Sequence, residues 1–141
     1  MTFEPVVQRV LQAGVTRGAA AAYASRRDGE WATTTWAEYA SQVRAAAKGL
    51  IALGVQPGQA VAIFGSNQPE WAVFDLAAMA VGALPAGIYP TDTAEEGAYV
   101  IGHSEAAVVL VEGAERLERV LGKRPALPGL RHIVMMGDDP R

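Results

Sequence analysis

The chain has 141 residues, a formal net charge of −3 and no cysteine, and half of its residues are apolar. This size suits one domain with a buried core, and the composition excludes global disorder. The weak acidic charge is unlike the basic face of a nucleic-acid-binding protein, and the lack of cysteine excludes disulfides and thiolate metal sites. No apolar run of about 18 residues exists and no signal peptide is visible, so we expect a soluble cytoplasmic protein.

The first 35 residues predict a short helix followed by a β-hairpin. Apolar residues at helical spacing favour a helix over 4–13 that ends at Gly14. Two extended runs then flank Asp28-Gly29, and both residues of this pair tolerate the positive φ of a tight hairpin turn.

A capping box marks the start of the next helix. Thr35 is followed three residues later by Glu38, and Gly54 and Pro57 supply the signals that end the helix. The apolar residues between them recur at helical spacing and predict one buried face: Trp36, Tyr39, Val43, Ala46, Ala47 and Leu50.

Strands and helices alternate through the rest of the chain. Short apolar runs predict buried strands over 60–64, 84–89, 107–111 and 132–136. The intervening segments predict helices from about 67 to 81, from Thr93 to about 102, and over 113–121, the last with Leu117, Val120 and Leu121 facing inward. Strands separated by crossover helices predict an α/β fold with a parallel, doubly wound three-layer sheet. We therefore expect one domain over 1–141, with the helix and hairpin in 1–35, the sheet in 36–136 and a loop in 137–141.

The sequence contains neither of the common phosphate-binding loop motifs, G-x-x-x-x-G-K-[ST] and G-x-G-x-x-G. Gly65-Ser66-Asn67 stands between a strand and a helix, where backbone N–H groups can meet an anion. We favour the simpler interpretation, in which Asn67 caps the helix and Glu70 completes the cap.

The other polar and aromatic candidates have structural interpretations. His103 is expected at the C-terminal end of a helix, and the pair His103 and His132 makes a poor metal site. Asp138-Asp139 is expected to be a solvated loop. The tryptophans at 31, 36 and 71 are expected to pack in the core or at its edge, because no basic groove accompanies them.

Several motifs resemble those of the adenylate-forming superfamily, which holds acyl-CoA synthetases, luciferases and peptide-synthetase adenylation domains. The matching segments occur in the family's order: T-W-A-E-Y at 35–39, L-x-x-L-G-V-x-P-G-x-x-V-A-I at 50–63, N-Q-P-E-W at 67–71, M-A-V-G-A-L-P-A-G-I-Y-P-T at 79–91 and A-Y-V-I-G-H-S-E-A at 98–106. The hairpin with D-G-E-W and the segment G-I-Y-P-T resemble bacterial long-chain fatty-acid–CoA ligases. Ala86-Gly87 departs from the Val-Pro found in many relatives, which puts the local turn in question.

The resemblance implies an acid–thiol ligase that uses ATP, Mg²⁺ and coenzyme A. In such enzymes a carboxylate first forms an acyl-adenylate, and the thiol of coenzyme A then displaces AMP. The family's phosphate loop, ribose-binding Asp, hinge and C-terminal Lys lie downstream of the segments matched here. We therefore expect a truncated piece or a degenerate remnant that is not catalytic alone. Aryl- and medium-chain ligases stay open as alternatives, because later residues build the acyl pocket.

The resemblance also implies a partial docking surface for coenzyme A. Tyr89, Pro90 and Thr91 match a stretch near its nucleotide, and Arg116 or Arg119 matches a basic position that meets its phosphate. The alternative for the two arginines is a solvated helix face. A homodimer through N-terminal elements is a further expectation.

Two other function classes stay open. One is a self-sufficient flavodoxin-like module that binds a phosphorylated ligand at Gly65-Ser66-Asn67. The other is a structural or interaction domain that assembles through an unpartnered face and binds no small molecule.

Overall fold

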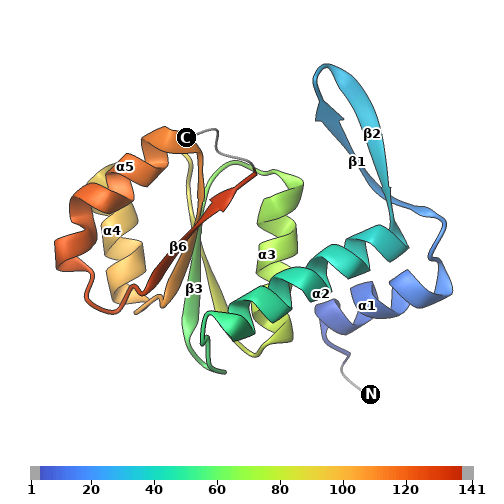
Figure 1. Ribbon diagram of the computed structural model, residues 1–141, viewed down its shortest axis with the longest axis horizontal. Helices are drawn as coiled ribbons and strands as arrows, with labels where there is room; N and C mark the ends of the chain where they lie inside the picture. Colours follow the sequence, from blue (N-terminus) through green and yellow to red (C-terminus); the bar gives the residue numbers. More distant parts are fainter. Residues whose placement is uncertain (1–3, 138–141) are drawn as a thin grey trace.

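The computed structural model describes residues 4–137, which begin with a helix, a hairpin and a longer second helix along which the first helix packs (Figure 1). Helix α1 spans Val6–Thr16, strands β1 (Ala21–Arg27) and β2 (Glu30–Thr35) pair antiparallel, and α2 runs over Trp36–Ala52. Asp28 and Gly29 adopt φ values of 51° and 84°, which confirms the predicted hairpin turn. The capping box at Thr35 is also confirmed, because its side chain accepts from the Glu38 N–H and the Glu38 carboxylate accepts from the Thr35 N–H.

A four-stranded parallel sheet forms the rest of the chain. Its strands β3 (Ala60–Phe64), β4 (Leu84–Ile88), β5 (Val108–Glu112) and β6 (His132–Met136) lie in the order β4-β3-β5-β6. The crossovers carry α3 (Pro69–Ala80), α4 (Ala94–His103) and α5 (Gly113–Lys123), the last followed by the short 3-10 helix η1 (Arg124–Ala126). The predicted parallel α/β fold is therefore confirmed.

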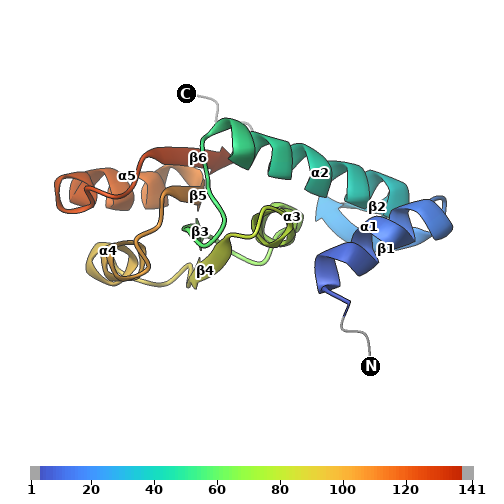
Figure 2. The same cartoon turned by 90° about the horizontal axis from the view of Figure 1, so that it is seen from below.

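Helices cover both faces of this sheet (Figure 2). Alternate residues of β3 face opposite sides, so that Val61 and Ile63 pack with α2 and α3 while Ala62 and Phe64 pack with α4 and α5. The side chains of β3 are buried along their whole length. Such two-sided burial explains why the strand is a continuous apolar run rather than an alternating one.

Helix α2 belongs to two cores. Its C-terminal half places Leu50 against the sheet, while its N-terminal half places Val43 with Val10 of α1 and Leu76 of α3 in a separate apolar cluster. The hairpin β1–β2 rises from this end of α2 and forms a two-stranded sheet of its own (Figure 1).

Three local predictions were wrong. Gly14 lies inside α1 rather than at its end, where it permits close packing: a Cβ at this position would lie 2.4 Å from the Cβ of Ala40. Strand β4 is an edge strand in the described sheet, and its Leu84 is 62% exposed, so it is not the buried strand expected. Leu121 is 44% exposed, because α5 turns only Leu117 and Val120 toward the sheet.

Candidate site at the carboxyl edge of the sheet

The strand order reverses at the carboxyl ends of β3 and β5. The chain passes from β3 to β4 on one side and then returns across β3 to place β5 on the other side. The loops that follow β3 and β5 therefore leave in opposite directions. Open α/β sheets commonly bind ligands in the crevice that such a reversal creates.

A carboxylate lies in this crevice. Oε2 of Glu112, at the end of β5, accepts hydrogen bonds from the Ser66 backbone N–H at 2.6 Å and from the Ser66 hydroxyl at 2.8 Å. Its other oxygen accepts from Nε2 of Gln68. One turn along α5, Nη1 of Arg116 lies 3.5 Å from Oε2 of Glu112. One side chain thus joins the loop after β3 to the helix after β5.

The surroundings of Glu112 favour its charged form. Burial raises the pKa of its carboxyl group, but the two hydrogen bonds from Ser66, the charge of Arg116 and the hydrogen bond from Gln68 together lower it below the usual 4.5. Gly65 makes room for the carboxylate, because a Cβ there would lie 2.8 Å from the Cβ of Glu112. The Nε of Arg116 is buried and has no hydrogen-bond partner.

The predicted segment Tyr89-Pro90-Thr91 forms a turn at the same edge. The Asp92 N–H donates to the Tyr89 carbonyl at 3.0 Å, and the Tyr89 N–H donates to the Asp92 carboxylate at 3.1 Å. The second predicted capping box follows at once, with Thr93 and Glu96 bonded reciprocally at the start of α4. The turn is thereby fixed, while the Tyr89 side chain stays 75% exposed.

Only one of the two predicted arginines contacts this turn. Nη1 of Arg119 donates to the Asp92 carbonyl at 2.5 Å, and its Nη2 donates to the Glu115 carboxylate at 2.6 Å. Arg116 instead contacts Glu112. The solvated helix face considered for this pair does not describe it, because the Arg116 and Arg119 side chains are only 19% and 29% exposed.

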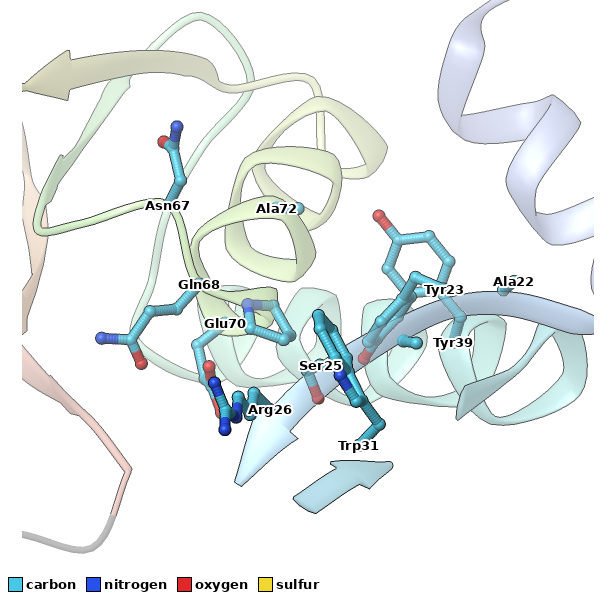
Figure 3. Close-up of a pocket in the computed structure, with 12 residues that line it drawn as sticks. Ala22, Tyr23, Ser25, Arg26, Trp31, Tyr39, Asn67, Gln68, Glu70 and Ala72 are labelled. Carbon is cyan, nitrogen blue, oxygen red and sulfur yellow. The ribbon is translucent and has the colours of Figure 1, made fainter. Parts of the chain in front are cut away.

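Two hollows border the loop after β3. A small one of about 240 Å³ lies toward β4 and is lined by residues that include Asn67, Trp71 and Tyr89. A larger one of about 750 Å³ lies between the loop, the first turn of α3 and the hairpin (Figure 3). Trp31 borders it from the hairpin, while the Gln68 side chain points away from Trp31. The conformation of residues 65–68 therefore shapes both hollows.

The sequence-based interpretation of this loop was wrong. Gln68, not Asn67, occupies the N-cap position of α3, and it makes no side-chain cap bond. The N–H of Ser66, which the anion-binding alternative requires, is already donated to Glu112. Glu112 itself was missed, although a carboxylate directly after an apolar central strand is a usable signal in a parallel sheet.

The remaining candidates lie elsewhere. His103 is the last residue of α4, as expected, and stacks on Tyr99 with ring centroids 5.4 Å apart. His132 begins β6 and so lies at the amino ends of the parallel strands, away from the site at their carboxyl ends. Of the tryptophans, Trp36 and Trp71 pack against apolar clusters, but Trp31 is 72% exposed, so its predicted packing was wrong. Asp138-Asp139 lies outside the described residues.

No helix within residues 4–137 is both long and apolar enough to cross a bilayer.

Comparison with known proteins agrees with the fold and the motifs. The long-chain-fatty-acid–CoA ligase FadD15 of Mycobacterium bovis is 43% identical over 109 residues, which cover 77% of this chain and 18% of the relative. The long-chain-fatty-acid–CoA ligase ACSBG2 of Xenopus laevis is 36% identical over 118 residues, covering 84% of this chain and 16% of the relative. The chain thus spans less than a fifth of the length of these relatives.

A solved structure described as a putative long-chain-fatty-acid CoA ligase from Rhodopseudomonas palustris superposes with a TM-score of 0.84 over 98% of this chain and 34% of its own. At 24% identity it supports the fold alone. The sequence family described as "AMP-binding enzyme" matches residues 11–141, which is nearly the whole chain. The chain therefore belongs to the AMP-binding enzyme family.

Proposed function

We propose that this chain forms part of an ATP-dependent long-chain fatty-acid–CoA ligase and does not catalyse the reaction alone. The observation that carries the proposal is the 43% identity to a relative of that name, within a family match over residues 11–141. In the proposed reaction, a fatty-acid carboxylate attacks the α-phosphate of ATP and releases pyrophosphate. The thiol of coenzyme A then attacks the acyl carbonyl, loses its proton and displaces AMP.

The proposed reaction implies a metal ion, which Mg²⁺-dependent enzymes commonly hold with one or two carboxylates and the phosphates of the substrate. Within residues 4–137, no three His, Asp or Glu side chains converge in a way that could hold an ion. The crevice at the strand reversal already contains the Glu112 carboxylate, which would repel the phosphates of ATP. We therefore assign neither Mg²⁺ nor ATP to residues described here.

The turn Tyr89-Pro90-Thr91 is the part that we propose to contact coenzyme A. The Tyr89 side chain is exposed, and Arg119 donates to the carbonyl of Asp92, the residue that follows this segment. A phosphate could compete for Arg119 with Glu115, whose side chain is 75% exposed and easily displaced. Arg116 is held by the less exposed Glu112, so we expect the smaller contribution from it.

The proposal can be tested in a hybrid enzyme. The 109 matched residues of this chain would replace the equivalent segment of the Mycobacterium bovis ligase, and folding would be confirmed by circular dichroism. ATP–pyrophosphate exchange reports acyl-adenylate formation, and thioester release reports the second step. We expect the hybrid to perform both steps with a fatty acid. A folded hybrid that performs neither would overturn the proposal.

The contact with coenzyme A has its own readout in the same hybrid. Arg119→Glu should raise the KM for coenzyme A and leave pyrophosphate exchange unchanged, with Arg116→Glu giving a smaller change in the same direction. An unchanged KM in both variants would remove these residues from the site without affecting the ligase proposal. The cytoplasmic location, the pairing of two copies and the domain limits stay predictions.

A further inference from the structure

Glu112 supplies to its own chain what a bound anion would supply. Its carboxylate receives one backbone N–H, one hydroxyl and one amide from the loop before α3, and it lies beside the guanidinium of Arg116. Backbone amides before a helix, together with an Arg, are also the groups that proteins use to hold phosphates.

Glu112 directs its carboxylate toward the neighbouring loop and not toward the first N–H groups of the helix that it precedes. It occupies the N-cap position of α5, yet its side chain makes no capping hydrogen bond to a backbone N–H of α5. It turns instead toward the neighbouring loop, over a separation of 46 residues in the chain. Gly65 leaves the space that this orientation needs.

We propose that Glu112 is a positioning residue that acts as a built-in anion: its carboxylate holds the loop of residues 65–68 closed and excludes phosphate groups from the crevice between β3 and β5. The crevice is thus a structural joint rather than a ligand site. Because the loop lines the hollows on both of its sides, Glu112 also sets their shape. Glu112 and its partners all lie within this chain, so the role of Glu112 does not depend on the ligase activity proposed above.

Phosphate titration of the ¹⁵N-labelled chain tests the proposal. In the wild-type chain, inorganic phosphate should cause no saturable shift of the Ser66 amide beyond that caused by sodium chloride at equal ionic strength. Glu112→Ala removes the repelling charge and frees Ser66 and Arg116, so phosphate should now shift the Ser66 amide saturably. We expect the variant to bind phosphate at least roughly tenfold more tightly than the upper limit set by the wild-type titration, because the Glu112 charge no longer opposes the anion.

Two further variants control this comparison. Glu118→Ala removes a carboxylate from the same helix and should behave like the wild type. Glu112→Gln keeps the volume of the side chain and removes its charge, so it should show a smaller gain in phosphate binding. This variant provides the test if the alanine variant does not fold. Saturable binding of phosphate at Ser66 in the wild-type chain, or no gain in a folded Glu112 variant, would overturn the proposal.

One outcome needs no variant. The Ser66 amide lies in a loop, but its bond to Glu112 should protect it from hydrogen exchange. Exchange of this amide at the rate of an open loop would contradict a closed joint.

Discussion

Helices α2 and α4 begin in a different way from helices α3 and α5. The first two start at complete capping boxes, in which Thr35 and Glu38, or Thr93 and Glu96, satisfy each other's N–H groups within four residues. Neither α3 nor α5 has a side-chain cap. Both of these helices leave the crevice at the strand reversal, and Glu112 links their starting points.

The difference shows two ways to fix a helix start. A capping box joins residues three positions apart, so it can fix the start of a helix whatever the surrounding fold. The contact of the Glu112 carboxylate with Ser66, here called the tie, is long-range. It depends on the sheet, since the pairing of β3 with β5 brings the two residues together. Changes at the tie should therefore affect the packed sheet, whereas changes at a cap should affect one helix.

The largest effect is expected from closing the space beside the tie. Gly65→Val places a Cβ within 2.8 Å of the Glu112 Cβ and adds two methyl groups to it, so we expect a loss of about 3 kcal/mol in the free energy of unfolding. Chemical denaturation measures this loss.

Gly49→Ala is the matched control in the locally capped helix α2, because a Cβ there meets nothing within 4 Å. It should stabilise the chain by about 0.5–1 kcal/mol. Equal losses in the two variants would contradict the packing described here.

Removing the carboxylate should have the next largest effect. Glu112→Ala leaves the Ser66 N–H and the Arg116 guanidinium without their acceptor in a partly buried site. We expect a loss of about 2 kcal/mol, measured by urea denaturation. A folded variant that unfolds at the same urea concentration as the wild type would contradict the role given to Glu112.

The two capping boxes should each contribute less to the free energy of unfolding than the Glu112 contact does. Thr35→Ala and Thr93→Ala each remove the acceptor of one capping box, and each should cost about 1 kcal/mol. Because the caps share no partner, the double variant should lose the sum of the two. Thermal unfolding of the three variants checks this additivity, and a strongly non-additive result would mean that the two helix starts are coupled.

The smallest effect is the pH dependence that the tie adds. The folded-state pKa of Glu112 lies below 4.5, so its charge stabilises the fold above that pH and this contribution is lost as the pH falls through the folded-state value. The difference in unfolding free energy between the wild type and Glu112→Gln should therefore be constant near neutrality and shrink below pH 4.5. A difference that grows with acidity would have the wrong sign for this mechanism.

The difference between local and long-range contacts also explains what could be predicted from the sequence. The capping boxes and the Asp28-Gly29 turn were found because their partners lie within a few residues of each other. The parallel sheet followed from continuous apolar runs, since burial on both faces imposes that pattern. The family and its motifs came from resemblance, and comparison with known proteins confirms the family.

Long-range contacts account for what was missed. Gly14 follows an apolar helical pattern and therefore predicts a helix end, whereas its close approach to Ala40 depends on how α1 meets α2. The local sequence predicts a cap at Asn67, since nothing near it shows that Ser66 is bonded to Glu112. The contact between Arg119 and Asp92 joins residues 27 positions apart and leaves no local pattern either.

The double role of α2 has a consequence for how the chain opens. A helix of 17 residues is about 25 Å long, and this one contributes Val43 to one core and Leu50 to another. Unwinding of the N-terminal half would expose the cluster shared with α1 and α3, and unwinding of the C-terminal half would expose the core beside the sheet. The hairpin layer and the sheet should therefore melt as one cooperative unit, and the slowest-exchanging amides of the N-terminal 52 residues should belong to the middle turns of α2.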